Sequence, residues 1–142
     1  MRIALTALIA LLCANLALGQ NRPLACQVDA SAGLKWKNGQ WQLANFAERK
    51  FLLVLSGDTL TKESVASTFP VPELADKSLA PWTSCSTDKV RGEIRCWVMQ
   101  DYLLIFNPNS NHGGTSMVSG ATDANIKYRD SIAIEAFTCQ PY

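Results

Sequence analysis

The stretch Gly33–Leu43, GLKWKNGQWQL, predicts a β-hairpin and, through it, a β-rich fold. An Asn-Gly pair between alternating apolar and polar residues is the strongest short-range hairpin signal, because both central residues of such a tight turn must adopt positive φ. A two-residue loop at Asn38 and Gly39 makes Trp36 and Trp41 cross-strand neighbours. We therefore predict that these two tryptophans lie opposite each other in an antiparallel pair.

The two faces of this hairpin differ in polarity. Because strand side chains alternate, one face carries Leu34, Trp36, Trp41 and Leu43, and the other carries only Lys and Gln side chains. An antiparallel pair with one apolar and one polar face is typically half-buried. Each tryptophan would bury roughly 150–250 Å². We therefore expect the pair to lie in the core; the alternative is an exposed platform for a ligand.

The first 19 residues, MRIALTALIALLCANLALG, have the pattern of a secretory signal peptide. Arg2 gives the positive n-region, Ile3–Leu12 the apolar stretch, and Ala17–Gly19 a small-x-small cleavage site. The apolar stretch is too short for a transmembrane helix. We expect a signal peptide over 1–19 and a single exported domain over 20–142, without a transmembrane segment and located in the periplasm or outside the cell.

The charge balance argues against nucleic-acid partners. The chain has 13 Lys and Arg against 12 Asp and Glu, and without Arg2 the two classes are equal. Nucleic-acid binding needs a basic excess or a basic stripe, and the sequence has neither. The expected partner is a protein or an envelope component, and the sequence assigns no oligomeric state.

Four cysteines lie beyond the predicted signal peptide: Cys26, Cys85, Cys96 and Cys139. An even number in an exported chain predicts two disulfides, for which three connectivities are possible. We favour Cys85–Cys96, which closes a short segment, and Cys26–Cys139, which joins the first expected strand to the last. The spacing does not suit a zinc site, and no metal is expected.

The remaining chain alternates short apolar runs with turn signals. Further strands are expected near residues 25–30, 51–55, 93–99, 102–107, 115–122 and 130–139, a helix near 59–69, and an irregular loop over 71–92. Seven or eight strands without alternating helices predict a mostly antiparallel β-barrel or β-sandwich, with one short helix and two disulfides.

The sequence carries little catalytic chemistry. His112 is the single histidine and lies in the turn-rich stretch NPNSNHGG, with no acid nearby in sequence. There is no G-x-S-x-G motif. The acidic residues, Glu135 among them, are scattered and are interpreted as solvent-exposed. No catalytic residue and no cofactor are expected. A binding module, inhibitor-like or ligand-binding, is favoured over the alternative of a secreted hydrolase whose catalytic residues assemble only in the fold.

Two segments are the best candidates for a binding surface. The segment 70–93 is long, rich in proline and closed by a predicted disulfide, and 107–114 is dense in turn residues. A rigid loop loses less entropy on binding. The candidate binding residues are Trp82, Lys89, Arg91, Asn109 and His112.

Overall fold

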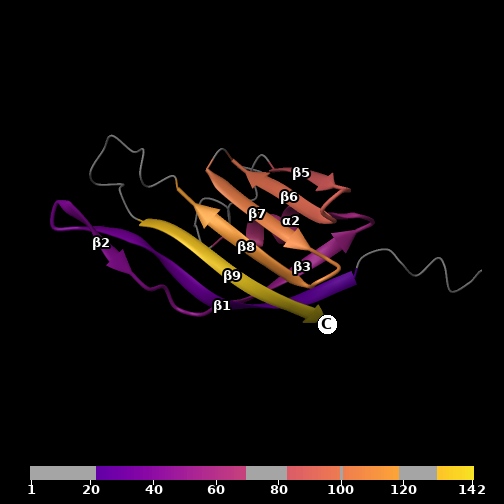
Figure 1. Ribbon diagram of the computed structural model, residues 1–142, viewed down its shortest axis with the longest axis horizontal. Coiled ribbons are helices and arrows are strands. Elements are labelled where there is room, and N and C mark those ends of the chain that lie inside the picture. The colour runs from indigo at the N-terminus through magenta and orange to yellow at the C-terminus, as the bar shows by residue number, and fades with distance from the viewer. Residues whose placement is uncertain (1–21, 70–82, 100, 119–130) are drawn as a thin grey trace, which may run out of the picture.

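The computed structural model describes residues 22–69, 83–99, 101–118 and 131–142. In these ranges one antiparallel sheet curls into a nearly closed eight-stranded barrel with one short helix (Figure 1). The elements are β1 (Arg22–Lys37), β2 (Gln40–Ala44), β3 (Lys50–Ser56), β4 (Thr59–Leu60), α2 (Lys62–Ser67), β5 (Thr83–Asp88), β6 (Glu93–Val98), β7 (Tyr102–Asn107), β8 (His112–Met117) and β9 (Ser131–Pro141). The predicted fold class is confirmed, and of its two forms the structure is the barrel. The predicted signal peptide lies outside the described residues.

The long strand β1 organises the barrel. The strand order is β4-β3-β1-β9-β8-β7-β6-β5, and β2 pairs with β1. β3 and β2 follow each other along one edge of β1, while β9 pairs along the other edge. The segment between β2 and β3 is also held along this edge of β1. Ser31 Oγ donates to the Phe46 carbonyl at 2.7 Å, and Val28 N donates to the Arg49 carbonyl at 2.9 Å.

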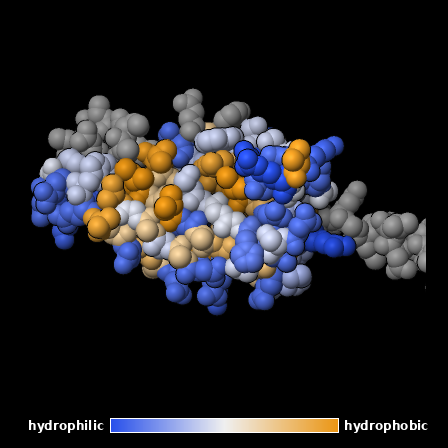
Figure 2. Space-filling view, viewed as in Figure 1, coloured by the Kyte–Doolittle hydropathy of each residue, from blue (hydrophilic) through white to orange (hydrophobic). Residues whose placement is uncertain are grey.

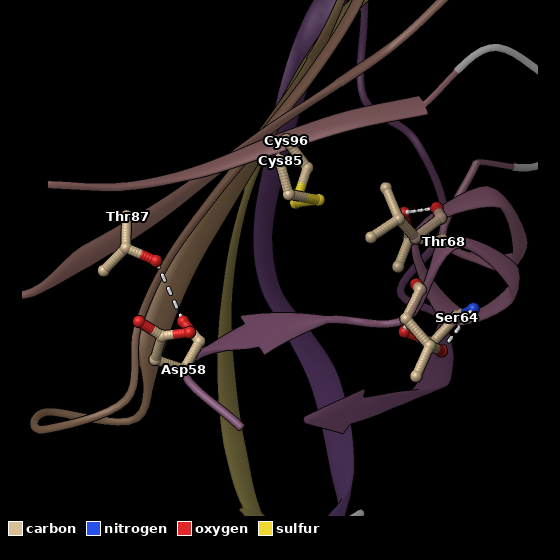
Figure 3. Close-up of a disulfide and its surroundings, with 8 residues drawn as sticks. Asp58, Ser64, Thr68, Cys85, Thr87 and Cys96 are labelled. Carbon is tan, nitrogen blue, oxygen red and sulfur yellow. Dashed lines mark hydrogen bonds between the residues drawn. A yellow bond between two sulfur atoms is a disulfide. The ribbon is translucent and has the colours of Figure 1, made fainter. Parts of the chain in front are cut away.

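The barrel closes between β4 and β5, with α2 beside the gap. Thr87 Oγ1 on β5 donates to the carbonyl of Asp58 in the β3–β4 turn at 2.9 Å (Figure 3). Thr61 begins the helix, because its hydroxyl accepts a hydrogen bond from Ser64 N at 3.3 Å. Val65 on the helix is fully buried. The helix expected near 59–69 is therefore confirmed, in a shorter form.

Inward-pointing side chains from alternate strand positions fill the barrel. An eight-stranded barrel has an interior about wide enough for side chains alone. Three phenylalanines meet there: the ring of Phe137 lies 5.1 Å from Phe51 and 6.3 Å from Phe106. The fully buried side chains include Leu53, Ile94, Leu104, Val28 and Val98. The interior is therefore a packed core.

Both predicted disulfides are confirmed. Cys26 lies opposite Cys139 on β1 and β9, and Cys85 lies opposite Cys96 on β5 and β6. The Cys85–Cys96 bridge points to the side of the sheet on which α2 lies (Figure 3). The irregular loop expected over 71–92 is wrong for its second half, because Thr83–Asp88 is strand β5. The bridge therefore joins two strands that already pair.

The hairpin forms in the predicted register, but its tryptophans are outside the core. Trp36 lies opposite Trp41, with ring centroids 5.2 Å apart and planes nearly perpendicular. Asn38 and Gly39 both have positive φ, 54° and 80°. Both tryptophans are only half-buried, and Leu43 on the same face is 91% exposed. The expectation that this face is core is wrong.

A β-bulge in β1 explains this error. Val28 lies opposite Phe137, and Ala30 lies opposite Ala136, so Asp29 is an extra residue on β1. A shift of one residue reverses the face on which every later side chain lies. Even-numbered residues of β1 therefore point into the barrel before the bulge and out of it afterwards.

The partner strand β9 keeps its own alternation and so confirms the reversal in β1. Ile134, opposite Ala32, is 60% exposed, whereas Ala133, opposite Gly33, is buried. The sheet that continues beyond the barrel therefore has an apolar outer face. Figure 2 shows apolar side chains in the middle of the visible face, with polar side chains at both ends of the long axis.

One acidic side chain points into the barrel near the bulge. The side chain of Glu135 is only 7% exposed and forms a bidentate ion pair with Arg49. Thr115 Oγ1 donates to the same carboxylate at 2.8 Å. The interpretation of Glu135 as solvent-exposed is wrong, because it lies on the inward face of β9 with Ala133 and Phe137. The buried carboxylate is satisfied by its partners.

Candidate functional site

Three turns meet at one end of the barrel, which we call the turn end. They are the β3–β4 turn (57–58), the β5–β6 turn (89–92) and the β7–β8 turn (108–111). In Figure 1 this end lies on the same side as the C-terminus, and the β1–β2 hairpin lies at the opposite side. The turns are tied together by side chains, since Asn107 Nδ2 donates to the Arg91 carbonyl at 3.3 Å.

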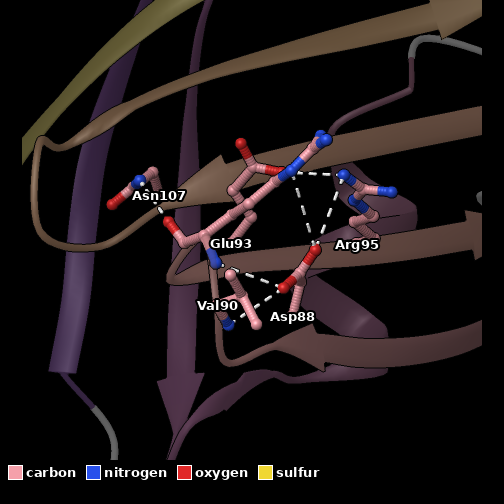
Figure 4. Close-up of polar contacts among 6 residues, drawn as sticks. Asp88, Val90, Glu93, Arg95 and Asn107 are labelled. Atoms are coloured by element: carbon pink, nitrogen blue, oxygen red, sulfur yellow. Dashed lines mark hydrogen bonds and ion pairs between the residues drawn. The ribbon is translucent and has the colours of Figure 1, made fainter.

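The β5–β6 turn has a fixed backbone. The Asp88 carboxylate accepts hydrogen bonds from the N–H groups of Val90 at 3.0 Å and Arg91 at 3.2 Å (Figure 4). Gly92 closes the turn with φ of 68°, which glycine adopts at low cost. A Cβ at this position would also lie 2.8 Å from Asn109 Nδ2 of the neighbouring turn. The positive φ thus favours glycine at this position, and a Cβ there would also displace the Asn109 side chain.

This rigid turn presents an apolar side chain to solvent. Val90 is 97% exposed at the tip, and Lys89 and Arg91 on either side of it are exposed as well. Single exposed apolar residues are common on protein surfaces. Val90 differs in that it is held at the tip of a hydrogen-bonded turn between two cations. Such a tip can enter an apolar pocket while its flanking charges contact anions around the rim.

The electrostatics of the turn favour the ionised form of Asp88. The hydrogen bond from the backbone N–H of Arg91 is the main cause that lowers the pKa of Asp88, and partial desolvation opposes it. The hydrogen bond from Val90 and the charges of Arg95 and Arg91 lower this pKa further. Arg95 lies 3.9 Å from Asp88 Oδ2 and 3.0 Å from Glu93 Oε2. The carboxylate of Asp88 therefore stays ionised, and keeps its hydrogen bonds to the backbone of the turn, over most of the pH range.

The β7–β8 turn is held in a similar way by Asn107. Its side-chain oxygen accepts from Asn109 N at 2.9 Å and from Ser110 N at 3.3 Å. Asn111 has φ of 58°, and its carbonyl accepts from Cys139 N at 2.8 Å, which joins the turn to β9. Asparagine tolerates this conformation better than most residues.

Four of the five predicted binding residues come together at the turn end. Lys89, Arg91 and Asn109 are exposed there on two adjacent turns, and His112, also exposed, is the first residue of β8 directly after the second turn. Trp82 lies outside the described residues. His112 Nδ1 is 2.6 Å from the Ser110 carbonyl, and since a carbonyl only accepts, Nδ1 carries the proton in this contact. His112 therefore helps to shape its own turn.

Sequence reasoning missed the residues that organise this end. Asp88 and Asn107 each hold the backbone two and three residues further along, which is the pattern of an Asx turn. Val90 was overlooked because it is a single apolar residue in a polar turn. An Asp or Asn at the end of an expected strand, followed by a single apolar residue between charged residues and then a glycine, is the sequence signal that could have found the β5–β6 turn.

Comparison with known proteins adds no relative. No family model matches the chain, and neither a curated protein nor a solved structure is significantly similar to it. Within the described ranges, no group of three or more His, Cys, Asp or Glu side chains is arranged to hold a metal ion. No helix in these ranges has the length and apolar character needed to cross a membrane.

Proposed function

We propose that this chain is a small exported binding module that engages a protein partner through the turn end of its barrel. The observation that carries the proposal is the exposed Val90 on a backbone fixed by Asp88, Gly92 and the neighbouring turn. A preorganised loop pays less conformational entropy on binding, which is how many inhibitor loops reach useful affinity. The proposal therefore includes an inhibitor-like mode of binding.

The chemistry of the tip indicates the kind of partner surface. Val90 offers apolar contact, and Lys89 and Arg91 offer positive charge beside it. An apolar pocket with an acidic rim is complementary to this arrangement. Rim charges act mainly on the association rate and on specificity, while a central apolar contact carries more of the affinity. The partner we propose is a protein, free or in the cell envelope, with such a pocket.

The disulfides support the exported part of the proposal. Both bridges lie inside the barrel, and such bonds persist in oxidising compartments. Together with the predicted signal peptide they favour a secreted or periplasmic location. The hydrolase alternative gains no support, because His112 Nδ1 donates to the backbone carbonyl of Ser110. A ligand inside the barrel is disfavoured by the packed phenylalanines of the core.

The experiment is affinity capture from envelope extract with the wild-type protein and two variants as bait. Val90→Asp removes the apolar tip. Val118→Asp is the matched control, because it makes the same substitution at an exposed valine at the opposite end of β8. We expect a protein captured by the wild type to be lost with Val90→Asp and retained with Val118→Asp. Circular dichroism of both variants checks that the fold is kept.

Two results would contradict the proposal. A protein retained equally by Val90→Asp shows that the turn end is not the binding surface. A loss of capture with Val118→Asp but not with Val90→Asp assigns binding to the opposite end. Lys89→Ala and Arg91→Ala refine a positive result, since loss of either cation should slow association and weaken its salt dependence.

A further inference from the structure

Strand β2 ends the sheet that extends beyond the barrel. In the part of the chain that the structure describes, β2 pairs with β1 alone. In the hairpin, Lys37 opposite Gln40 is the hydrogen-bonded pair that closes the turn, so hydrogen-bonded and non-hydrogen-bonded pairs alternate from there. The backbone N–H and C=O groups of Trp41 and Leu43 therefore point away from β1, towards the outer edge.

This edge lacks the usual protection against pairing. Natural edge strands carry charges, proline or bulges that prevent another strand from adding to them. β2 has the sequence QWQLA, with none of these, and its Leu43 is 91% exposed. β5, at the end of the strand order, differs: it has Asp88 and is bonded to the β3–β4 turn through Thr87. An unprotected edge beside an apolar face is suited to strand addition.

The strand is also complementary to itself. β2 can pair antiparallel with β2 of a second copy about a two-fold axis that passes through Gln42. In this register Trp41 lies opposite Leu43 of the copy, and Leu43 lies opposite Trp41 of the copy. These are the two residues whose backbone groups point to the edge, so this register forms hydrogen-bonded pairs at both positions. The strand has no charge, and therefore no like charges are brought together.

We propose that a second copy of this chain pairs with β2, so that the two sheets continue across a two-fold symmetric dimer. The copy covers Leu43 with Trp41 on the apolar outer face, and places Gln42 against its counterpart on the polar face. The same patch on both partners is the usual arrangement of a homodimer. A contact of one five-residue strand is small, so the dimer is weak and dissociates in the micromolar to millimolar range.

A single introduced cysteine tests the register. Gln42→Cys places the thiol on the two-fold axis, in a non-hydrogen-bonded pair whose Cα atoms are about 4.5 Å apart, which suits a disulfide. Gln40→Cys is the matched control on the same strand and face, because the two copies of this residue would lie about 14 Å apart. Both are made with Cys13→Ser, so that the introduced thiol is the single unpaired one. We expect mild oxidation to link Gln42→Cys into dimers and to leave Gln40→Cys monomeric.

Sedimentation velocity of the unlinked chain provides the second test. Leu43→Asp should weaken association about tenfold or more. By symmetry, the dimer contains two contacts in which the introduced charge faces Trp41 of the other copy. Leu52→Asp, an exposed leucine on β3, should leave association unchanged. Equal cross-linking of both cysteine variants would show random collision and overturn the proposal. The proposal would also be overturned if the chain stays monomeric throughout this concentration range and Gln42→Cys does not cross-link. The β2 edge would then be a candidate site for a strand of another protein.

Discussion

At the scale of single residues, Asp88 decides whether the tip of the β5–β6 turn has one shape or several. Its carboxylate accepts two backbone N–H groups and faces two guanidinium groups. Each of these interactions favours the ionised form, so the shape of the tip is linked to the charge of one half-buried side chain.

The lowered pKa of Asp88 predicts an acid transition confined to this turn. The contribution of the carboxylate is fully present above the unfolded value of about 3.9, and it is lost as the pH falls through the lower folded value. We expect the amide resonances of Val90 and Arg91 to shift together, with a midpoint below that of a free aspartate. An NMR titration measures this. Asp88→Asn should abolish the transition, and a midpoint at or above the ordinary value would contradict the assignment.

The buried pair of Arg49 and Glu135 predicts a large cost for removing one partner. Arg49→Met leaves a carboxylate that is 7% exposed without its counter-ion, and we expect a loss of about 2–4 kcal/mol in the free energy of unfolding. The double variant Arg49→Met with Glu135→Leu should recover most of this loss. Arg91→Met is the exposed control and should cost less than about 0.5 kcal/mol. Denaturant unfolding distinguishes these cases, and equal costs for the two arginine variants would refute the buried role.

At the scale of elements, the β1–β2 hairpin behaves as an extension of the barrel. The ring centroids of its two tryptophans are 5.2 Å apart, and neither tryptophan belongs to the cluster of buried residues in the core. Removal of one aromatic ring from the hairpin should therefore destabilise the protein less than removal of one aromatic ring from the core.

We predict that Trp41→Ala lowers the free energy of unfolding by about 1–2 kcal/mol, because it removes one aromatic pair and a half-buried ring. Phe137→Ala, at a position that is 1% exposed, should cost about 3–5 kcal/mol. Chemical denaturation of both variants measures the difference. A loss for Trp41→Ala as large as that for Phe137→Ala would place the hairpin in the core after all.

The elements also show what the sequence could predict. The Asn38-Gly39 turn, the register of Trp36 with Trp41 and the strand at residues 102–107 follow from local patterns, and they are confirmed. The burial of the hairpin could not be predicted, because it depends on the extra residue Asp29, which follows Val28 opposite Phe137 and has no partner of its own in the β1–β9 register. A bulge leaves the alternation of apolar residues unchanged in the sequence while it reverses the face in space.

The candidate site was partly predictable for a related reason. Lys89, Arg91, Asn109 and His112 were found as members of two polar turns, and turn composition is a local property. That the two turns touch is a consequence of the β5–β6–β7–β8 order, which no local pattern specifies. The proposed role of Val90 rests on its exposure, which is known only from the structure.

At the scale of the whole molecule, the two disulfides should stabilise the fold unequally. The bridged cysteines are 113 residues apart for Cys26–Cys139 and 11 apart for Cys85–Cys96. In the chain-entropy model these loops correspond to about 4.8 and about 2.8 kcal/mol. We expect the double Cys→Ala variant of the first pair to be about 2 kcal/mol less stable than that of the second. Thermal unfolding of both variants measures this, and the reverse order would show that strain or packing outweighs loop length.

The pairing of β1 with β9 has a consequence for how the chain is made. β1 is the first described strand and β9 the last, so the barrel cannot close until residues 131–141 have been synthesised. Contacts this distant in sequence also slow folding. If Cys26 is oxidised by another cysteine of the described chain before Cys139 has been made, its partner is Cys85 or Cys96, and that bond is non-native. Efficient maturation therefore requires either that oxidation waits for the complete chain or that a thiol–disulfide isomerase reshuffles the first bond.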